Sequence, residues 1–111
     1  MSSVRFLVFP ASDTNPYFIN VSSDNVLNEL HACVGGYIEG FPLRNFVLSN
    51  ERQLSLYVNE EGLLLNLPTN KHVPGAVGNA VLGICDDEGD EVGFAADVSV
   101  DKAVALLKAA L

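Results

Sequence analysis

The residue types that most often carry out catalysis are sparse in this chain of 111 residues. Its two histidines, His31 and His72, and its two cysteines, Cys33 and Cys85, are the candidates for a nucleophile and its base. A nucleophilic thiol needs a neighbouring group that removes its proton. None of the four stands in a recognisable nucleophile motif, although Cys33 and His72 could still meet in space. The sequence therefore predicts no catalytic residues and a protein that is not an enzyme.

Both cysteines are interpreted as reduced thiols in the core. Neither belongs to a Cys-x-x-Cys pair or stands near two histidines, and both have apolar neighbours, in the stretches ACV and GIC. Cysteine in such surroundings commonly packs as a small apolar residue. A disulfide between Cys33 and Cys85 stays open as an alternative, and it requires their α-carbons to lie close together.

Two further patterns are weak signals for bound ions or cofactors. The acidic run 86–91 could hold a hard cation, but it lacks the alternating ligand spacing and the distant glutamate of a calcium-binding loop. An acidic hairpin tip is more typically solvated. The glycines at 35–36 and at 75 and 78 lack the remaining residues of a phosphate-binding loop. We therefore predict no metal site and no cofactor.

A group of polar residues remains as the candidate binding site. Tyr37 and Glu39 share one face of a predicted strand, opposite Ile38, so a phenol and a carboxylate would stand side by side at about 7 Å. This arrangement could contact a partner or a small polar ligand, or it could form only the solvated face of a sheet. The predicted binding residues are Gly36, Tyr37, Glu39, Asn59, Glu61 and Asn70.

The elements that must position these residues are mostly strands. Short β-branched and aromatic runs between turn-forming residues predict strands over 4–9, 17–21, 36–41, 53–58, 63–67, 81–85 and 92–95. The first two should form a hairpin. A second hairpin is expected from 53–58 and 63–67 across the turn 59–62. Pro42 and Asn45 are expected to end the strand 36–41, and residues 75–80 to hold at most a short helix.

Two amphipathic helices are predicted, over about 25–34 and 99–111. Apolar residues recur at helical spacing in both. Gly35 falls where a helix commonly stops in the left-handed conformation, and Ser99 is a typical N-terminal cap. The whole chain, residues 1–111, is therefore predicted to be a single α+β domain, with a mostly antiparallel sheet and the two helices packed on it.

Composition favours a protein with an apolar interface. The apolar fraction of 49% and the mean hydropathy of +0.26 are high for a small soluble protein, which needs polar cover. Some of that surface is expected to be covered by a protein partner or in a homo-oligomer.

Charge and hydropathy exclude other partners. Six basic residues against fourteen acidic ones give a formal charge of −8, and the basic residues are too scattered to neutralise a row of phosphates. We therefore predict no direct nucleic-acid binding, although an acidic protein can instead mimic nucleic acid. No stretch is long enough to span a bilayer, and the first residues are unlike a secretory signal, which predicts a cytoplasmic protein.

The order of the motifs resembles a small family of uncharacterised domains from phages, large DNA viruses and bacterial mobile elements. The likeness covers roughly residues 26–85, and its specific part is VGGYIE at 34–39, NEEG at 59–62 and Asn70, followed by the apolar stretch VLGIC. The family has no known activity. The resemblance implies a setting, a viral or mobile-element accessory protein, and such proteins often act by binding host components.

Three functions are compatible with these features. The first is a non-enzymatic accessory protein that binds and inhibits a host component through an apolar patch rimmed by acids. The second is a binder of a small, nucleotide-like ligand through the polar residues named above. The third is an acidic mimic of nucleic acid. A hydrolase or transferase ranks last, because no catalytic set is visible.

Overall fold

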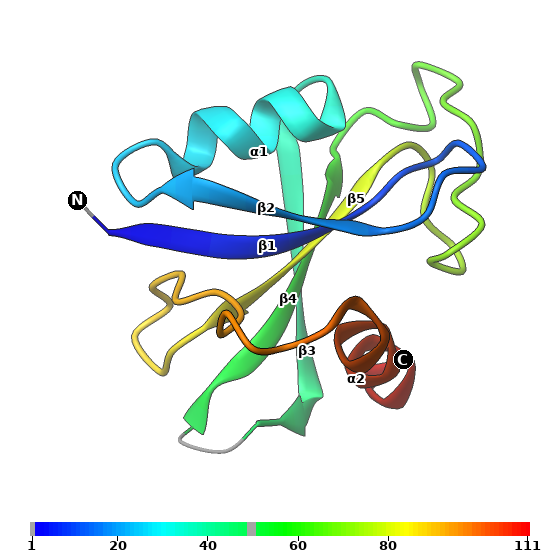
Figure 1. Ribbon diagram of the computed structural model, residues 1–111. Helices are drawn as coiled ribbons and strands as arrows, with labels where there is room; N and C mark the ends of the chain where they lie inside the picture. Colours follow the sequence, from blue (N-terminus) through cyan, green and yellow to red (C-terminus); the bar gives the residue numbers. More distant parts are fainter. Residues whose placement is uncertain (1, 49–50) are drawn as a thin grey trace.

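The protein is an α+β domain in which one antiparallel sheet carries a helix on each face (Figure 1). The computed structural model describes residues 2–48 and 51–111, and for residues 44–47 the backbone alone. In these residues the strands are β1 (Ser3–Phe9), β2 (Tyr17–Ser22), β3 (Ile38–Val47), β4 (Gln53–Asn59) and β5 (Ala80–Cys85), and the helices are α1 (Val26–Val34) and α2 (Val100–Ala110). The predicted fold class and both predicted helices are confirmed.

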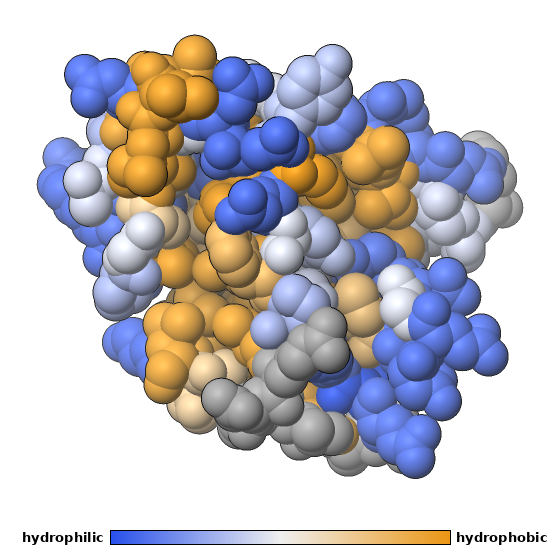
Figure 2. Space-filling model, turned by 180° about the vertical axis from the view of Figure 1, so that it is seen from behind, coloured by the Kyte–Doolittle hydropathy of each residue, from blue (hydrophilic) through white to orange (hydrophobic). Residues whose placement is uncertain are grey.

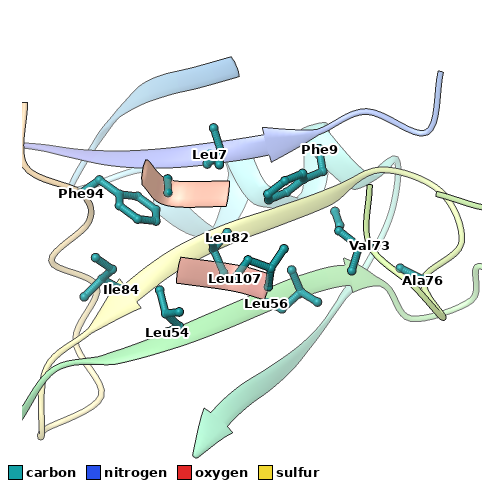
Figure 3. Close-up of a cluster of buried hydrophobic side chains, with 12 residues drawn as sticks. Leu7, Phe9, Leu54, Leu56, Val73, Ala76, Leu82, Ile84, Phe94 and Leu107 are labelled. Carbon is teal, nitrogen blue, oxygen red and sulfur yellow. The ribbon is translucent and has the colours of Figure 1, made fainter. Parts of the chain in front are cut away.

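Strand β1 is buried on both faces, so its side chains build two separate cores. The sheet order is β2-β1-β5-β4-β3, and β1 pairs with β2 and β5. Val4 and Phe6 point to the core under α1, whereas Leu7 and Phe9 point to the core under α2. Figure 3 shows the second core, where these two residues meet side chains from β4, β5 and α2. The continuous apolar run of β1 follows from this double burial.

Helix α1 ends as the sequence predicts. Gly35 has φ 79, in the left-handed region, and its N–H donates to the carbonyl of His31. The hairpin of β1 and β2 is also confirmed, with Phe6 opposite Ile19. At the other end of the chain, the Ser99 hydroxyl accepts a hydrogen bond from the N–H of Lys102 and caps α2.

The predicted second hairpin is wrong. Residues 63–67 do not pair with β4, whose neighbours are β3 and β5. Residues 60–66 instead form consecutive turns, in which the N–H of Leu65 donates to Glu61 and that of Leu67 to Gly62. Both edges of β4 are already paired, with β3 and with β5. Because β5 is buried on both faces, its pairing with β4 buries more apolar surface than a pairing of β4 with residues 63–67 would. We call residues 60–66 the leucine turn.

Strand β3 does not end at Pro42, contrary to prediction, and runs on to Val47 through an irregularity in register. β3 is an edge strand, where proline is tolerated. The carbonyl of Tyr37 accepts from the N–H of Glu60, so by antiparallel alternation Pro42 is a position that faces the free edge. Its missing N–H therefore leaves no bond of the sheet unmade.

Residues 91–94 form a wedge between β1 and β5 instead of the predicted return strand. β1 pairs with β5 only from Leu7 onward, which leaves a gap at the start of β1. In the gap, the N–H of Gly93 donates to Ile84 and that of Phe94 to Arg5. Only an isolated bridge between Cys85 and Glu91 has strand geometry there. We call residues 91–94 the wedge.

Residues 75–80 hold no helix, which agrees with the expectation of at most a short one. Gly75 and Gly78 have φ 85 and 75, values outside the right-handed helical region. The segment 68–79 is a loop with a single bridge between Thr69 and Val77. Within the described residues, neither helix has the length and apolar character to cross a membrane.

The wedge gives the first prediction. Gly93 has φ 73, and a Cβ there would lie 2.5 Å from the backbone nitrogen of Arg5, whereas Gly89 has φ 87 and nothing within 4 Å. Both substitutions to alanine place a Cβ in the left-handed region, at a cost of about 1 kcal/mol. Gly93→Ala must also move backbone, so it should lower the free energy of unfolding by about 3 kcal/mol or more. Urea denaturation checks this, and equal losses for Gly93→Ala and Gly89→Ala would show that the wedge is not tightly packed.

Candidate functional site

An apolar groove lies on the α2 face of the sheet, where α2 leaves the strands uncovered. It has a volume of about 580 Å³. Phe41 of β3 and Leu56 and Val58 of β4 line it, and Phe41 stands opposite Leu56 in the pairing of the two strands. Residues 62–64 of the leucine turn, residues 73–77 and Leu111 complete the lining. The groove is therefore a part of the sheet face bordered by two loops and the end of a helix.

The side chains around this groove are unusually exposed for their type. Leu63 is 83% exposed, Leu64 85% and Leu111 59%. Seen from behind, apolar surface gathers on the side that carries the leucine turn and the C-terminal end of α2 (Figure 2). Apolar surface that gathers around a concavity marks binding sites more often than isolated exposed residues do.

The rim of the groove is acidic. Glu39 of β3 and Glu60 of the leucine turn are exposed and line it, and no lysine, arginine or histidine is among its described lining residues. Glu39 stands opposite Val58 in the sheet, so its carboxylate rises directly beside the apolar floor. The groove thus combines apolar contact area with negative charge at its edge.

Two of the predicted binding residues hold the loops around the groove. Asn59 is 5% exposed, its amide donates to the carbonyl of Val34 at 3.0 Å, and its oxygen accepts from the N–H of Glu61 at 2.7 Å. A Cβ on Gly36 would come within 3.0 Å of the same side chain. Asn59 therefore ties the end of α1 to the start of the leucine turn.

Asn70 has the same kind of role in the loop 68–79. It is 2% exposed, its amide donates to the carbonyls of Phe9 and Gly78, and its oxygen accepts from the N–H groups of His72 and Val73. These bonds use the polar atoms of the side chain inside the protein. The loop that borders the groove is thus fastened to the end of β1.

The remaining predicted residues do not form one site. Tyr37 lies before the first residue of β3, and its ring packs edge-on against His31 of α1, with centroids 5.6 Å apart. Glu39 lines the groove. The structure thus brings Gly36, Asn59 and Glu61 together, whereas Asn70 lies in another loop. Binding by these residues stays a prediction.

A polar network that the sequence did not reveal lies on the α1 face of the sheet. The Tyr57 hydroxyl donates to Oε1 of Glu91, and the Cys85 thiol donates to the same oxygen at 3.4 Å. The Ser55 hydroxyl lies 3.4 Å from the Cys85 sulfur. The alternation of side chains along β4 could have placed Ser55 and Tyr57 on one face of the sheet. Glu91, in contrast, belongs to an acidic run that is typical of a solvated turn, and no feature of the sequence predicts that its side chain is buried.

Burial dominates the electrostatics of this network. It raises the pKa of Glu91 above its usual value, although the hydrogen bonds from Tyr57 and Cys85 oppose the shift. Burial also raises the pKa of the Tyr57 hydroxyl and of the Cys85 thiol, and Glu91 adds to both shifts. Oε2 of Glu91 is buried without a hydrogen-bond partner among the described residues, which adds to the cost of the ionised form.

Neither cysteine is in an activated setting. Both are free, half-buried thiols, as predicted, and burial raises the pKa of Cys33 as well. A thiol that stays protonated is a weak nucleophile. His72 donates through Nε2 to the carbonyl of Thr14 at 3.0 Å, and its ring lies tilted beside that of Phe9, with centroids 6.0 Å apart. The histidine of the conceivable dyad is thus engaged elsewhere.

The acidic run between β5 and the wedge closes its own turn. Asp86 accepts hydrogen bonds through Oδ1 from the N–H groups of Glu88 and Asp90. A polar hollow of about 350 Å³ opens between this turn and the residues Ser55, Tyr57 and Cys85. Across residues 2–48 and 51–111, no group of three or more metal-ligating side chains converges.

The network gives the second prediction. A glutamate whose pKa is raised by folding stabilises the fold below the unfolded pKa of about 4.5, and this contribution is lost as the pH rises through the higher folded value. Glutamine does not titrate, so the variant Glu91→Gln does not lose this stability as the pH rises. Its free energy of unfolding relative to the unchanged protein should therefore increase with pH across this window and level off above it. Urea denaturation at several pH values checks this.

Glu88→Gln is the matched control, because Glu88 is exposed in the neighbouring turn. We expect no comparable trend for this variant. If the stability difference between Glu91→Gln and the unchanged protein were the same at pH 4 and at neutral pH, burial of the Glu91 carboxylate would be disproved.

Comparison with known proteins identifies a family. The model of a domain of unknown function, DUF3846, matches residues 4–103. No curated protein and no solved structure matches the chain. The matched range includes β1 after its first residue, β2 to β5, the wedge and the first residues of α2. The expectation of a family without known function is confirmed, and the chain belongs to the DUF3846 family.

Proposed function

We propose that this protein is a non-enzymatic binding module that holds an apolar segment of a partner protein in the groove beside α2. The observation that carries the proposal is the pair of exposed leucines, Leu63 and Leu64, on the border of a preformed apolar concavity. Covering one leucine side chain contributes about 1.5–3 kcal/mol, so a few such contacts support a specific complex.

The leucine turn presents these side chains from a defined backbone. Asn59 fixes its start through the N–H of Glu61, and Asn66 near its end has φ 56. A Cβ on Gly62 would lie 2.6 Å from a methyl group of Val77, so the turn packs closely on the loop 68–79. A border that is already ordered loses little conformational entropy on binding, which favours affinity.

The alternatives have less support. A ligand of drug size fits a groove of about 580 Å³, but Asn59 and Asn70, the buried amides expected to orient it, use their polar atoms in internal hydrogen bonds. Nucleic-acid mimicry needs acids spaced along one surface. Among the described acids, the densest group is the single turn 86–91.

The cysteines and the motif resemblance support a setting for the proposed function. Cys33 and Cys85 are free, which is typical of proteins in a reducing compartment and supports a cytoplasmic location. The raised thiol pKa values support the absence of nucleophilic catalysis. The motifs at 34–39 and 59–62 support an accessory protein of a virus or mobile element, with inhibition of a host component as its role.

The third prediction tests the groove by a matched pair of variants. Leu64→Gln removes an exposed leucine at the groove, and Leu27→Gln removes one that is 58% exposed on α1. In affinity capture from lysate of the native host, the unchanged protein and Leu27→Gln should retain the same partner. Leu64→Gln should retain at least about tenfold less, because one anchor contact is lost.

Both variants should unfold at the same urea concentration as the unchanged protein, since each leucine is largely solvated. Equal retention by Leu64→Gln and Leu27→Gln, or no retained protein at all, would contradict binding through the groove. Light scattering on the purified protein separates a heterologous partner from self-association.

A further inference from the structure

We infer that the segment held in the groove is amphipathic and basic, with apolar side chains on the floor and lysine or arginine beside Glu39 and Glu60. The inference rests on the proposed function and adds the chemistry of the partner. Glu39 stands opposite Val58 and Glu60 follows Val58 by two residues, so both carboxylates border the same end of the floor. A segment that fills the groove therefore passes close to a carboxylate at its edge.

No described basic side chain of the protein forms an ion pair with these carboxylates. Neither Glu39 nor Glu60 takes part in a salt bridge among the described residues. The only described ion pair joins Lys71 and Asp13, away from the lining of the groove. As far as the described side chains go, the rim charges are thus free to pair with charges that a partner brings.

Helix α2 adds to the negative potential of the groove. Its last turn ends at Ala110, and Leu111, the residue that caps the helix, lines the groove. The last carbonyl groups of a helix carry partial negative charge, because they lack partners within the helix. Lys108 lies in this turn but is not among the lining residues. Cationic side chains of a partner are therefore favoured at this end also.

A second copy of the chain fits the groove poorly. The exposed leucines that it would insert are preceded by Glu60 and Glu61, so self-association would bring these acids against Glu39 and Glu60 of the first copy. Each copy also carries a formal charge of −8. Like charges placed together across an interface oppose association, and opposite charges favour it. The charge pattern thus selects a basic partner over self-association.

The fourth prediction uses synthetic peptides as probes. Three fluorescein-labelled amphipathic helical peptides share a leucine face and carry only lysine, only glutamine or only glutamate on the other face. Fluorescence anisotropy with the full chain should show affinity in the order lysine, glutamine, glutamate. Added salt should lower the affinity of the lysine peptide towards that of the glutamine peptide and leave the affinity of the glutamine peptide unchanged, because screening removes the contribution of the charges.

Variants locate the effect. The double variant Glu39→Gln and Glu60→Gln should weaken the lysine peptide about 3- to 20-fold and leave the glutamine peptide unchanged. A double variant of the acidic turn, Asp87→Asn and Glu88→Gln, removes the same charge elsewhere and should change neither affinity by more than about twofold. Leu64→Gln should weaken all peptides that bind.

The possible outcomes separate the two proposals. Equal binding of the lysine and glutamine peptides, or equal effects of the rim and turn variants, overturns the basic partner but leaves binding through the groove intact. The basic partner is also overturned, and binding through the groove kept, if no peptide binds but Leu64→Gln retains less of the captured protein than the unchanged chain does. A dimer that Leu64→Gln dissolves would show that a second copy occupies the groove and would overturn the inference. Peptide binding that Leu64→Gln does not weaken overturns the groove itself.

Discussion

A single short helix cannot cover one face of this sheet, and the candidate site follows from that constraint. Five strands about 4.8 Å apart span roughly 19 Å, whereas a helix is about 10 Å wide. Helix α2 covers part of the face through Ala103 and Leu107, and Phe94 of the wedge and Val73 of the loop 68–79 pack into the same core. The strip over Phe41 and Val58 stays open and becomes the groove.

The motif residues keep this opening in shape. Asn59 belongs to NEEG, and it joins the end of α1 to the leucine turn. Asn70 joins the loop 68–79 to the end of β1. Buried amides with all polar atoms paired define loop conformation more strictly than apolar contacts do, since a small shift leaves a buried group unsatisfied. Asn59 and Asn70, which suggested a polar ligand site, thus hold in place the loops that border an apolar groove.

The sequence predicted those parts of the fold that depend on local signals. The αL position of Gly35, the Ser99 cap and the hairpin of β1 and β2 follow from turn and capping chemistry within a few residues. The leucine turn was mistaken for a strand, because an apolar run carries no information about which edges of β4 are already paired. The inward position of Glu91 depends on the gap between β1 and β5 and on the space above Gly83, where a Cβ would lie 2.9 Å from Oε2. Such contacts are properties of the assembled sheet.

The central claim is that the uncovered strip of the sheet is a binding surface. Methyl NMR of the leucine and valine residues, recorded while the lysine peptide is added to the full chain, tests it most directly. We expect chemical-shift changes at Leu56, Val58, Leu63 and Leu64, which line the groove, and none at Leu27 or Val26 of α1. Changes centred on α1, or spread evenly over both faces, would contradict the account.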